Sequence, residues 1–396
     1  MMNPSKPGMI SVAHIAAGFI AVLVGYTGSA AIIFQAAHTL GADNTVVASW
    51  FWALGLGMGL TCIVLSLVYR QPILTAWSTP GAALLVTSLE GVTLAEAVGA
   101  FYLCSGLLFL TGISGLFDRL VRLLPPGLAP AMLAGVLFQF GADAMSYLGS
   151  DTLLVLAMLA VFLIMQVRVP RFAVPLALAV GLVIAAMQGA LVGEHIDLSL
   201  AKPVWTAPAW SLSTAIGVAL PLYVVTLASQ NVPGIATLRA HGYDAPASPV
   251  IATTGATGLA LAGFGGFSFN FAAITAAICM SPDVDPDPKQ RYKAAVWAGV
   301  FYILIGLFAN AVAGLFTAFP LALVAAIAGL ALLGTIANSL ADSLANPMAR
   351  VPAILTFLTT TSGLELLGIG SAFWGLAIGI GAWHLQRVAT APADRA

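Results

Sequence analysis

The chain has 396 residues, of which 14 are basic and 15 acidic, for a net charge of −1. Charged residues make up 7% of the chain and apolar residues 60%, with a mean hydropathy of +1.01. Soluble domains carry about 25% charged and 45–50% apolar residues. So few charges cannot cover a soluble fold of this length, which excludes a soluble enzyme, a nucleic-acid-binding protein and a disordered chain.

The fold class expected is an all-α membrane protein with fourteen spans, because a spanning helix needs about 20 mainly apolar residues. Nine segments are clear apolar runs, near 11–34, 47–68, 94–116, 152–167, 173–192, 211–231, 292–317, 320–341 and 369–386. Five are less regular, near 73–89, 128–148, 249–264, 265–281 and 351–363. With the N-terminus in the cytoplasm, 13 of the 14 basic residues fall on the cytoplasmic side and only Lys202 falls outside. This positive-inside bias predicts fourteen spans with both termini cytoplasmic.

The polar stretch at 193–210 divides the chain into a first seven-span repeat, 11–192, and a second, 211–388. An odd number of spans inverts the second repeat relative to the first, which is a common plan of secondary transporters. The third segment of each half is irregular in the same way. ILTAWST lies between two prolines (72–80), and FSFN follows a glycine-rich turn (263–266). Each of these segments predicts a short strand followed by a half-length helix.

Irregular backbone in a membrane is tolerated only where protein or a water-filled cavity covers it. Two half-helices that meet at the midplane present unpaired N–H groups and positive dipole ends, which bind an anion without a basic side chain. Two ordinary short helices with Gly and Pro at their ends are the alternative. Ser78, Thr79 and Asn270 are residue types that cap helix N-termini. The predicted site takes these residues from the two segments: Trp77, Ser78, Thr79, Gly81, Phe267, Ser268, Phe269 and Asn270.

A second polar cluster, Ser229-Gln230-Asn231, lies in the first span of the second repeat. The equivalent span of the first repeat carries Tyr26 in a polar patch that extends to His38. These groups either contact substrate or hydrogen-bond neighbouring helices, and His38 is expected at the membrane interface. The loop 282–291, rich in Pro and Asp, is expected to be solvated, with its bases near lipid headgroups.

Four stretches resemble the benzoate:proton symporter (BenE) family: LTAWSTPGAALL (74–85), SQNVPGIATLRAHGY (229–243), FNFAAITAAICMSPDVDPDPKQRY (269–292) and LTFLTTTSGLELLGIGSAFWGL (355–376). The resemblance extends over nearly the whole chain. The family is similar in architecture to the uracil and xanthine transporters and to bicarbonate and sulfate carriers. The resemblance implies a core domain (about 11–116 plus 211–317) and a gate domain (about 128–192 plus 320–388). It also implies a homodimer as one expected state, because dimers are common among such carriers.

In the nucleobase branch, carboxylates on the eighth and tenth spans hold the base and couple protons. The matching stretches here, 229–231 and 268–270, contain no acid. A carboxylate there would repel benzoate, so the departure suits an aromatic acid, with Trp77, Phe267 and Phe269 as rings that enclose its phenyl group. The sequence leaves two alternatives for the group that carries the proton. It is either an acidic side chain, with Asp143 and Asp342 as candidates, or the substrate itself travelling as the acid.

Taken together, the sequence and the resemblance predict an importer of benzoate, or of a closely related aromatic carboxylate, in a bacterial-type inner membrane. It is expected to be coupled to protons and to work by alternating access. An anion exchanger, or an uncoupled aromatic-acid or nucleobase-type carrier, is the alternative on the same scaffold. The expected partners are the substrate, protons and the lipid bilayer. No catalytic residue, cofactor or metal site is expected, because the histidines and cysteines are scattered along the chain.

Overall fold

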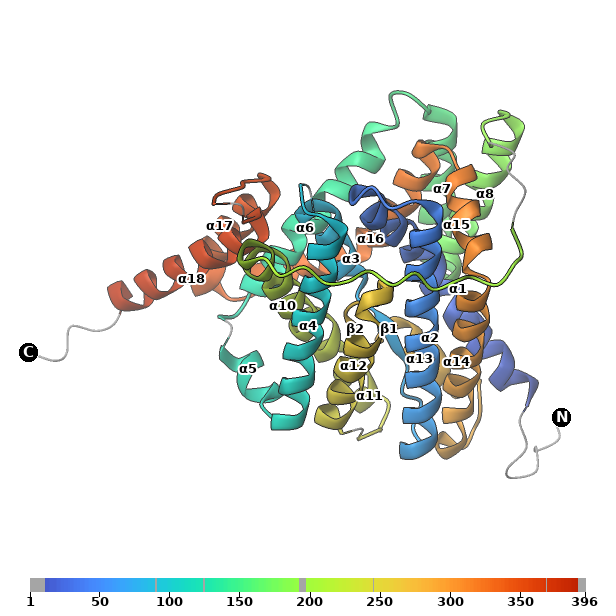
Figure 1. Ribbon diagram of the computed structural model, residues 1–396, viewed down its shortest axis with the longest axis horizontal. Helices are drawn as coiled ribbons and strands as arrows, with labels where there is room; N and C mark the ends of the chain where they lie inside the picture. The colour runs from blue at the N-terminus through green and yellow to red at the C-terminus, as the bar shows by residue number, and fades with distance from the viewer. Residues whose placement is uncertain are drawn as a thin grey trace, which may run out of the picture.

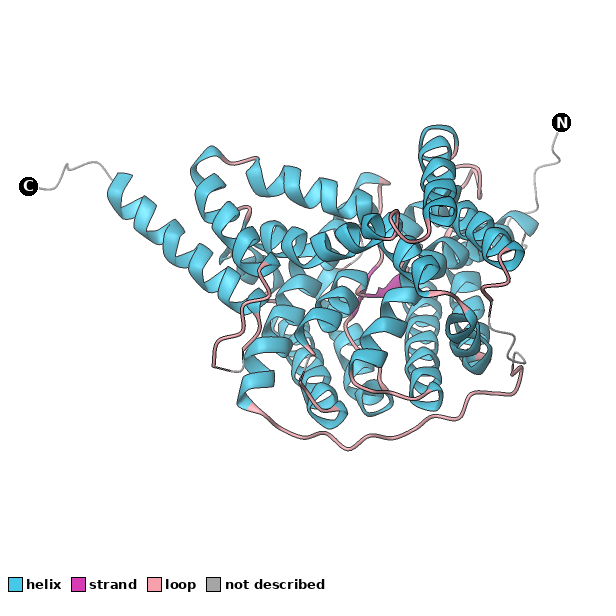
Figure 2. Ribbon diagram, turned by 90° about the horizontal axis from the view of Figure 1, so that it is seen from above, coloured by secondary structure: helices cyan, strands magenta, loops and turns pink. Residues whose placement is uncertain are grey.

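The computed structural model describes residues 11–89, 91–123, 125–191, 197–244, 246–367 and 369–390. These residues form a helical bundle with one pair of short strands among the helices (Figures 1 and 2). The elements of the first half are α1 (Val12–Thr39), α2 (Asn44–Tyr69), β1 (Thr75–Trp77), α3 (Thr79–Ser88), α4 (Leu94–Ser114), α5 (Phe117–Leu123), α6 (Leu128–Ser146), α7 (Thr152–Arg168) and α8 (Ala173–Met187).

The second half repeats this order of elements. It contains α9 (Leu212–Thr214), the π-helix η2 (Ala215–Ala219), α10 (Leu220–Val225), the π-helix η3 (Thr226–Asn231), α11 (Val232–Ala240), α12 (Ala247–Leu261), β2 (Phe269–Phe271), α13 (Ile274–Met280), α14 (Tyr292–Leu307), α15 (Ala309–Ala318), α16 (Leu321–Leu344), α17 (Arg350–Thr361) and α18 (Ser371–Thr390). Single 3₁₀ turns lie at 170–172, 262–264, 288–290 and 347–349.

Several of these helices are suited to a lipid bilayer. Among the described residues, seven helices are long and apolar enough to cross a membrane, and two bent helix pairs bring the number to nine. One pair is α1, bent by 41° between its two parts, and the other is α14 with α15, bent by 68°. The chain is therefore a mostly helical membrane protein, and the count of fourteen spans stays a prediction.

The packing pairs elements of the two halves reciprocally. Helix α2 packs along α14, α4 along α12, α6 along α16, and β1 pairs with β2. Small residues allow the close approach of α2 and α14, because a Cβ added at Gly55 would meet Gly306, and one added at Gly59 would meet Gly299. Such contacts between small residues are typical of helices that pack within a membrane.

The segment 197–211 between the halves runs in an extended path across the face of the bundle shown in Figure 1. The backbone N–H of Ala201 donates to the carbonyl of Leu307, and that of Ala209 donates to the carbonyl of Ala95. The segment is therefore fixed to the ends of α14 and α4 rather than looping away from the bundle.

Candidate functional site

The two irregular segments meet as an antiparallel strand pair inside the bundle (Figure 1). Ala76 of β1 lies opposite Asn270 of β2. The backbone N–H of Ser78 donates to the carbonyl of Ser268 at 3.1 Å, which extends the pairing beyond Trp77, the last residue of β1. Both predicted strands are present, and we refer to residues 75–78 and 268–271 as the crossing.

Helix α3 begins as the sequence predicts, and α13 does not. Ser78 is the N-cap of α3, and its Oγ accepts a hydrogen bond from the Gly81 N–H at 2.9 Å. Pro80 occupies the first turn, where the missing N–H costs nothing. Asn270, by contrast, lies within β2, and α13 starts after Ala273 without a side-chain cap. The expectation that Asn270 caps the second half-helix is therefore wrong.

The turn into β2 fixes the orientation of the Asn270 side chain. Ser268 has a φ of +46°, in the left-handed region that residues other than glycine rarely occupy. Its carbonyl accepts a hydrogen bond from Asn270 Nδ2 at 2.8 Å. Because a carbonyl only accepts, the nitrogen of the Asn270 amide must point toward it. Asn270 is fully buried, and its Oδ1 has no hydrogen-bond partner among the described residues.

The predicted cluster Ser229-Gln230-Asn231 lies in the π-helical turn η3, a distortion that often marks functional sites. Asn231 is fully buried, and its Oδ1 accepts a hydrogen bond from the backbone N–H of Phe271 at 3.0 Å. Its Nδ2 has no hydrogen-bond partner within the described ranges. Ser229 and Gln230 are half-buried. The fold thus brings Asn231 directly against β2. In the sequence, residues 229–231 and residues 267–270 were two separate groups of candidates.

Two of the predicted aromatic residues pack beside the crossing. The rings of Tyr26 and Trp77 meet edge to face, with centroids 4.7 Å apart. The indole Nε1 of Trp77 donates to Ser29 Oγ at 2.8 Å. Tyr26 is buried, and its hydroxyl is without a partner in the part of the chain that the structure describes. Tyr26 and Trp77 therefore form an aromatic wall with an unused polar atom.

Phe267 and Phe269 point elsewhere. Phe267 packs against Trp50 and Phe101, with ring centroids 5.8 Å and 5.2 Å away. The ring of Phe269 occupies the space that Gly57 of α2 leaves open, since a Cβ on that glycine would collide with it. Both side chains are buried in the core. In this structure the three predicted rings do not enclose one common space.

A cavity of about 800 Å³ lies between α1, α3, α15, α6 and α16. This volume is within the range of small-molecule sites, roughly 300–1,000 Å³. Its lining includes Gln35 and His38 from α1 and Asp143 from α6, and Asp143 Oδ1 accepts from Gln139 Nε2 at 3.1 Å. The aromatic lining residues are Phe34, Phe140, Tyr147, Phe316 and Phe319. Of the two acidic candidates, Asp143 faces this cavity, whereas Asp342 is exposed near the end of α16 and is not part of the lining.

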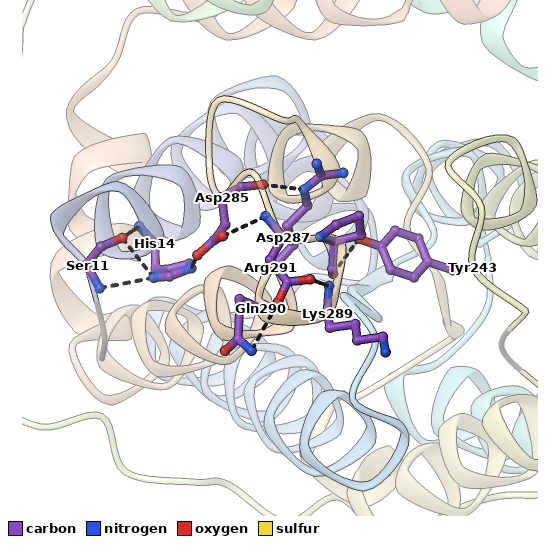
Figure 3. Close-up of polar contacts among 9 residues, drawn as sticks. Ser11, His14, Tyr243, Asp285, Asp287, Lys289, Gln290 and Arg291 are labelled. Atoms are coloured by element: carbon purple, nitrogen blue, oxygen red, sulfur yellow. Dashed lines mark hydrogen bonds and ion pairs between the residues drawn. The ribbon is translucent and has the colours of Figure 1, made fainter. Parts of the chain in front are cut away.

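A polar cluster occupies the other end of α1 (Figure 3). His14, which is almost fully buried, places Nε2 3.1 Å from Asp285 Oδ2. Its Nδ1 accepts from the backbone N–H of Ser11 at 3.0 Å. Arg291 is also buried, with its guanidinium bound to the carbonyls of Asp285 and Met280. The loop 282–291 is thus tied to α1 and α13, which its composition did not indicate.

A multi-pass helical membrane protein with two broken segments that cross at buried polar groups has the architecture of a membrane transporter. The family of benzoate membrane transport proteins, BenE, matches residues 8–385. The chain belongs to this family, and it is a membrane transport protein rather than an enzyme.

Two relatives and one solved structure show how far the similarity extends. The chain is 50% identical over 363 residues to the inner membrane protein YdcO of Escherichia coli K12, covering 92% of this chain and 93% of the relative. It is 41% identical over 371 residues to the benzoate membrane transport protein of Acinetobacter baylyi, covering 93% and 94%. The fold is similar to the transmembrane domain of a cyanobacterial bicarbonate transporter, BicA, with a TM-score of 0.63, 13% identity and coverage of 93% and 97%.

Proposed function

We propose that this protein imports benzoate, or a closely related aromatic carboxylate, across the bacterial inner membrane together with protons. The observation that carries the proposal is the crossing, which combines the buried, uncharged amides of Asn231 and Asn270 with the aromatic wall that Trp77 of β1 forms with Tyr26. An aromatic acid needs both features, an apolar face for its ring and hydrogen-bonding groups for its carboxyl. The name of the Acinetobacter relative supports the same substrate.

We propose alternating access between a core domain (about 11–116 plus 211–317) and a gate domain (about 128–192 plus 320–388), in fourteen spans with both termini cytoplasmic. The reciprocal packing of α2 with α14, α4 with α12 and α6 with α16 supports an inverted repeat. The cavity supports the division, since α1, α3 and α15 of the proposed core line one part of it and α6 and α16 of the proposed gate line another. A homodimer is part of the proposal only by resemblance to related carriers.

The proton has an energetic role in this proposal. Moving an anion inward against a negative interior costs about 2.3 kcal/mol per 100 mV. One accompanying proton removes the net charge, so uptake becomes insensitive to voltage and follows the pH gradient. Its carrier is either a side chain, for which Asp143 is better situated than Asp342 because it lines the cavity, or the substrate's own carboxyl group.

Initial rates of radiolabelled benzoate uptake into proteoliposomes test the proposal. Because the neutral acid also crosses lipid unaided, the rate in protein-free vesicles is subtracted. We expect an inside-alkaline gradient to raise the protein-dependent rate, and Asn270→Leu and Gln230→Leu to abolish it. Asn346→Leu is the matched control, because this amide caps a 3₁₀ turn after α16, far from the crossing in sequence. A protein-dependent rate that ignores the pH gradient contradicts proton coupling.

The alternative, anion exchange on the same scaffold, is supported by the lack of an acidic side chain at the crossing. It predicts that unlabelled benzoate inside the vesicles accelerates uptake without any pH gradient. If internal benzoate accelerates uptake and an imposed pH difference has no effect, the result supports anion exchange and contradicts proton symport.

A further inference from the structure

The crossing contains one unused hydrogen-bond acceptor and one unused donor, and their identities are fixed by their partners. Asn270 must turn its nitrogen toward the Ser268 carbonyl, which leaves Oδ1 as an acceptor. Asn231 must turn its oxygen toward the Phe271 N–H, which leaves Nδ2 as a donor. Exchanging O and N in either amide would set donor against donor or acceptor against acceptor.

The two amides belong to one place in the fold. Asn231 binds the backbone of Phe271, the residue that directly follows Asn270, so both amides meet β2 at adjacent positions. Both side chains are fully buried. The residues beside them, Ala76 opposite Asn270 and Gln230 before Asn231, are half-buried and form the accessible rim of the crossing.

We propose that the crossing binds its substrate as the neutral carboxylic acid, so that the transported proton travels on the substrate itself; this rests on the proposed function. A carboxylic acid offers one O–H donor, which matches Asn270 Oδ1, and one carbonyl acceptor, which matches Asn231 Nδ2. A carboxylate offers acceptors only, and would leave Asn270 Oδ1 facing another acceptor in a buried site.

The start of α3 offers little to an anion. Pro80 has no N–H, and the N–H of Gly81 is taken by Ser78 Oγ, so the first turn of that helix keeps only the N–H of Thr79 for a ligand. Within the described residues, the side chains that hydrogen-bond at the crossing are all uncharged: Ser29, Met58, Thr61, Cys62, Thr75, Trp77, Ser78, Cys104, Asn231, Ser268 and Asn270. The crossing therefore provides no charged side chain that would favour the ionised substrate.

Near their ends, the helices around the crossing carry His14 and His38 on α1, Glu96 on α4 and Lys293 on α14. The other titratable groups on these elements are thiols and phenols, among them Cys62 on α2, Cys104 on α4, Cys279 on α13, Tyr26 on α1, Tyr223 on α10 and Tyr302 on α14. The ordinary pKa values of these groups, about 8.5 and 10, keep them uncharged between pH 5.5 and 7.5. Asp143 of α6 faces the cavity instead. A pH dependence of binding over this range therefore reports on the substrate's own carboxyl group, or on a protein group such as Asp143 or His38, which both line the cavity.

In the proposed sequence, benzoate takes up one proton from the outer solution, forming the O–H bond. The neutral acid occupies the crossing, and after release inside the O–H bond breaks and the proton passes to water. One proton and one anion move together, so no net charge crosses the membrane.

Equilibrium displacement of radiolabelled benzoate from the purified full-length protein tests this at pH 5.5, 6.5 and 7.5. The competitors are benzamide, a neutral molecule with the same donor and acceptor pattern, and benzenesulfonate, a permanent anion with acceptors only. We expect the apparent Kd of benzoate to rise about tenfold per pH unit, benzamide to compete equally at all three pH values, and benzenesulfonate not to compete.

Competition by benzenesulfonate but not benzamide, with a benzoate Kd that is flat with pH, overturns the inference and leaves benzoate binding intact. If the apparent Kd of benzoate changes tenfold per pH unit but benzamide does not compete, the inference is also overturned, because a protein group such as Asp143 then carries the proton. No benzoate binding at any pH refutes the proposed function itself.

Discussion

Arg291 gives the sharpest prediction about what holds the second half-helix in position. The side chain is only 7% exposed. Its Nε donates to the carbonyl of Asp285 at 2.8 Å (Figure 3). Its Nη1 donates to the carbonyl of Met280, the last residue of α13, at 2.9 Å. The guanidinium thereby joins the end of α13 to the loop that follows it.

The cost of Arg291→Ala follows from these two bonds. A hydrogen bond to a charged group contributes about 1.5–3 kcal/mol, so the pair sets an upper limit of about 3–6 kcal/mol. Asp285 and Met280 are themselves buried, whereas the loop residues Asp283 and Pro286 are exposed. We therefore expect water to enter the space left by the side chain and to offset part of the loss. We expect a loss of about 2–4 kcal/mol in the free energy of unfolding.

Unfolding of the purified protein in one detergent, followed for the variants side by side, measures this loss. Lys289→Ala is the matched control, because it removes an exposed cation from the same loop, and we expect a change within about 0.5 kcal/mol. Arg291→Lys keeps the charge but loses the fork of guanidinium donors, so its loss in free energy of unfolding should lie between those of Arg291→Ala and Lys289→Ala. If Arg291→Ala is as stable as Lys289→Ala, the guanidinium does not hold this loop.

Three further substitutions probe the local structure. Ser78→Ala should cost about 0.5–2 kcal/mol by leaving the Gly81 N–H without its cap, measured by thermal unfolding. Gly265→Ala should lower the yield of folded protein, because this residue has a φ of +92°. Tyr243 lies between α11 and α12, and burial raises the pKa of its hydroxyl, which donates to the Pro288 carbonyl at 2.9 Å. Its contribution should be present below its ordinary pKa near 10 and lost as the pH rises through the raised value, and Tyr243→Phe should remove this alkaline dependence.

The broken segments were predictable because their signals are local. Pro80, Gly81 and Ser78 specify a helix start within a few residues, and the structure has that start. The same logic was wrong for Asn270, whose cap preference is overridden by pairing with β1 over residues 269–271. The pairing of β2 with β1 is a tertiary contact that makes Asn270 a strand residue rather than a helix cap. The residues next to Asn270 in the sequence do not indicate that contact.

Other features depend on contacts between distant parts of the chain. In the sequence His14 is only one of several scattered histidines, whereas the fold places Asp285 3.1 Å from its Nε2. It likewise gathers His38 and Asp143 around one cavity, although the sequence suggested an interfacial residue and a separate acid. The local sequence pattern cannot reveal such pairings, because the pairings arise from how the two halves pack against each other.

The aromatic residues show a further limit. Trp77 and Phe269 lie within the crossing and Phe267 directly precedes it, and the comparison with the nucleobase branch suggested that all three face the substrate. The direction of each ring depends on strand register and on the glycines that make room for it, such as Gly57 for Phe269. Only Trp77 joins Tyr26 beside the crossing.

The central claim is that an aromatic acid binds at the crossing, and the position of a bound substrate tests it most directly. A crystal structure with 4-bromobenzoate, first shown to compete with benzoate, locates the ring by the anomalous signal of bromine. We predict a peak beside Trp77, with the carboxyl group between Asn231 and Asn270. A bromine peak confined to the cavity lined by His38 and Asp143, with none at the crossing, contradicts the account.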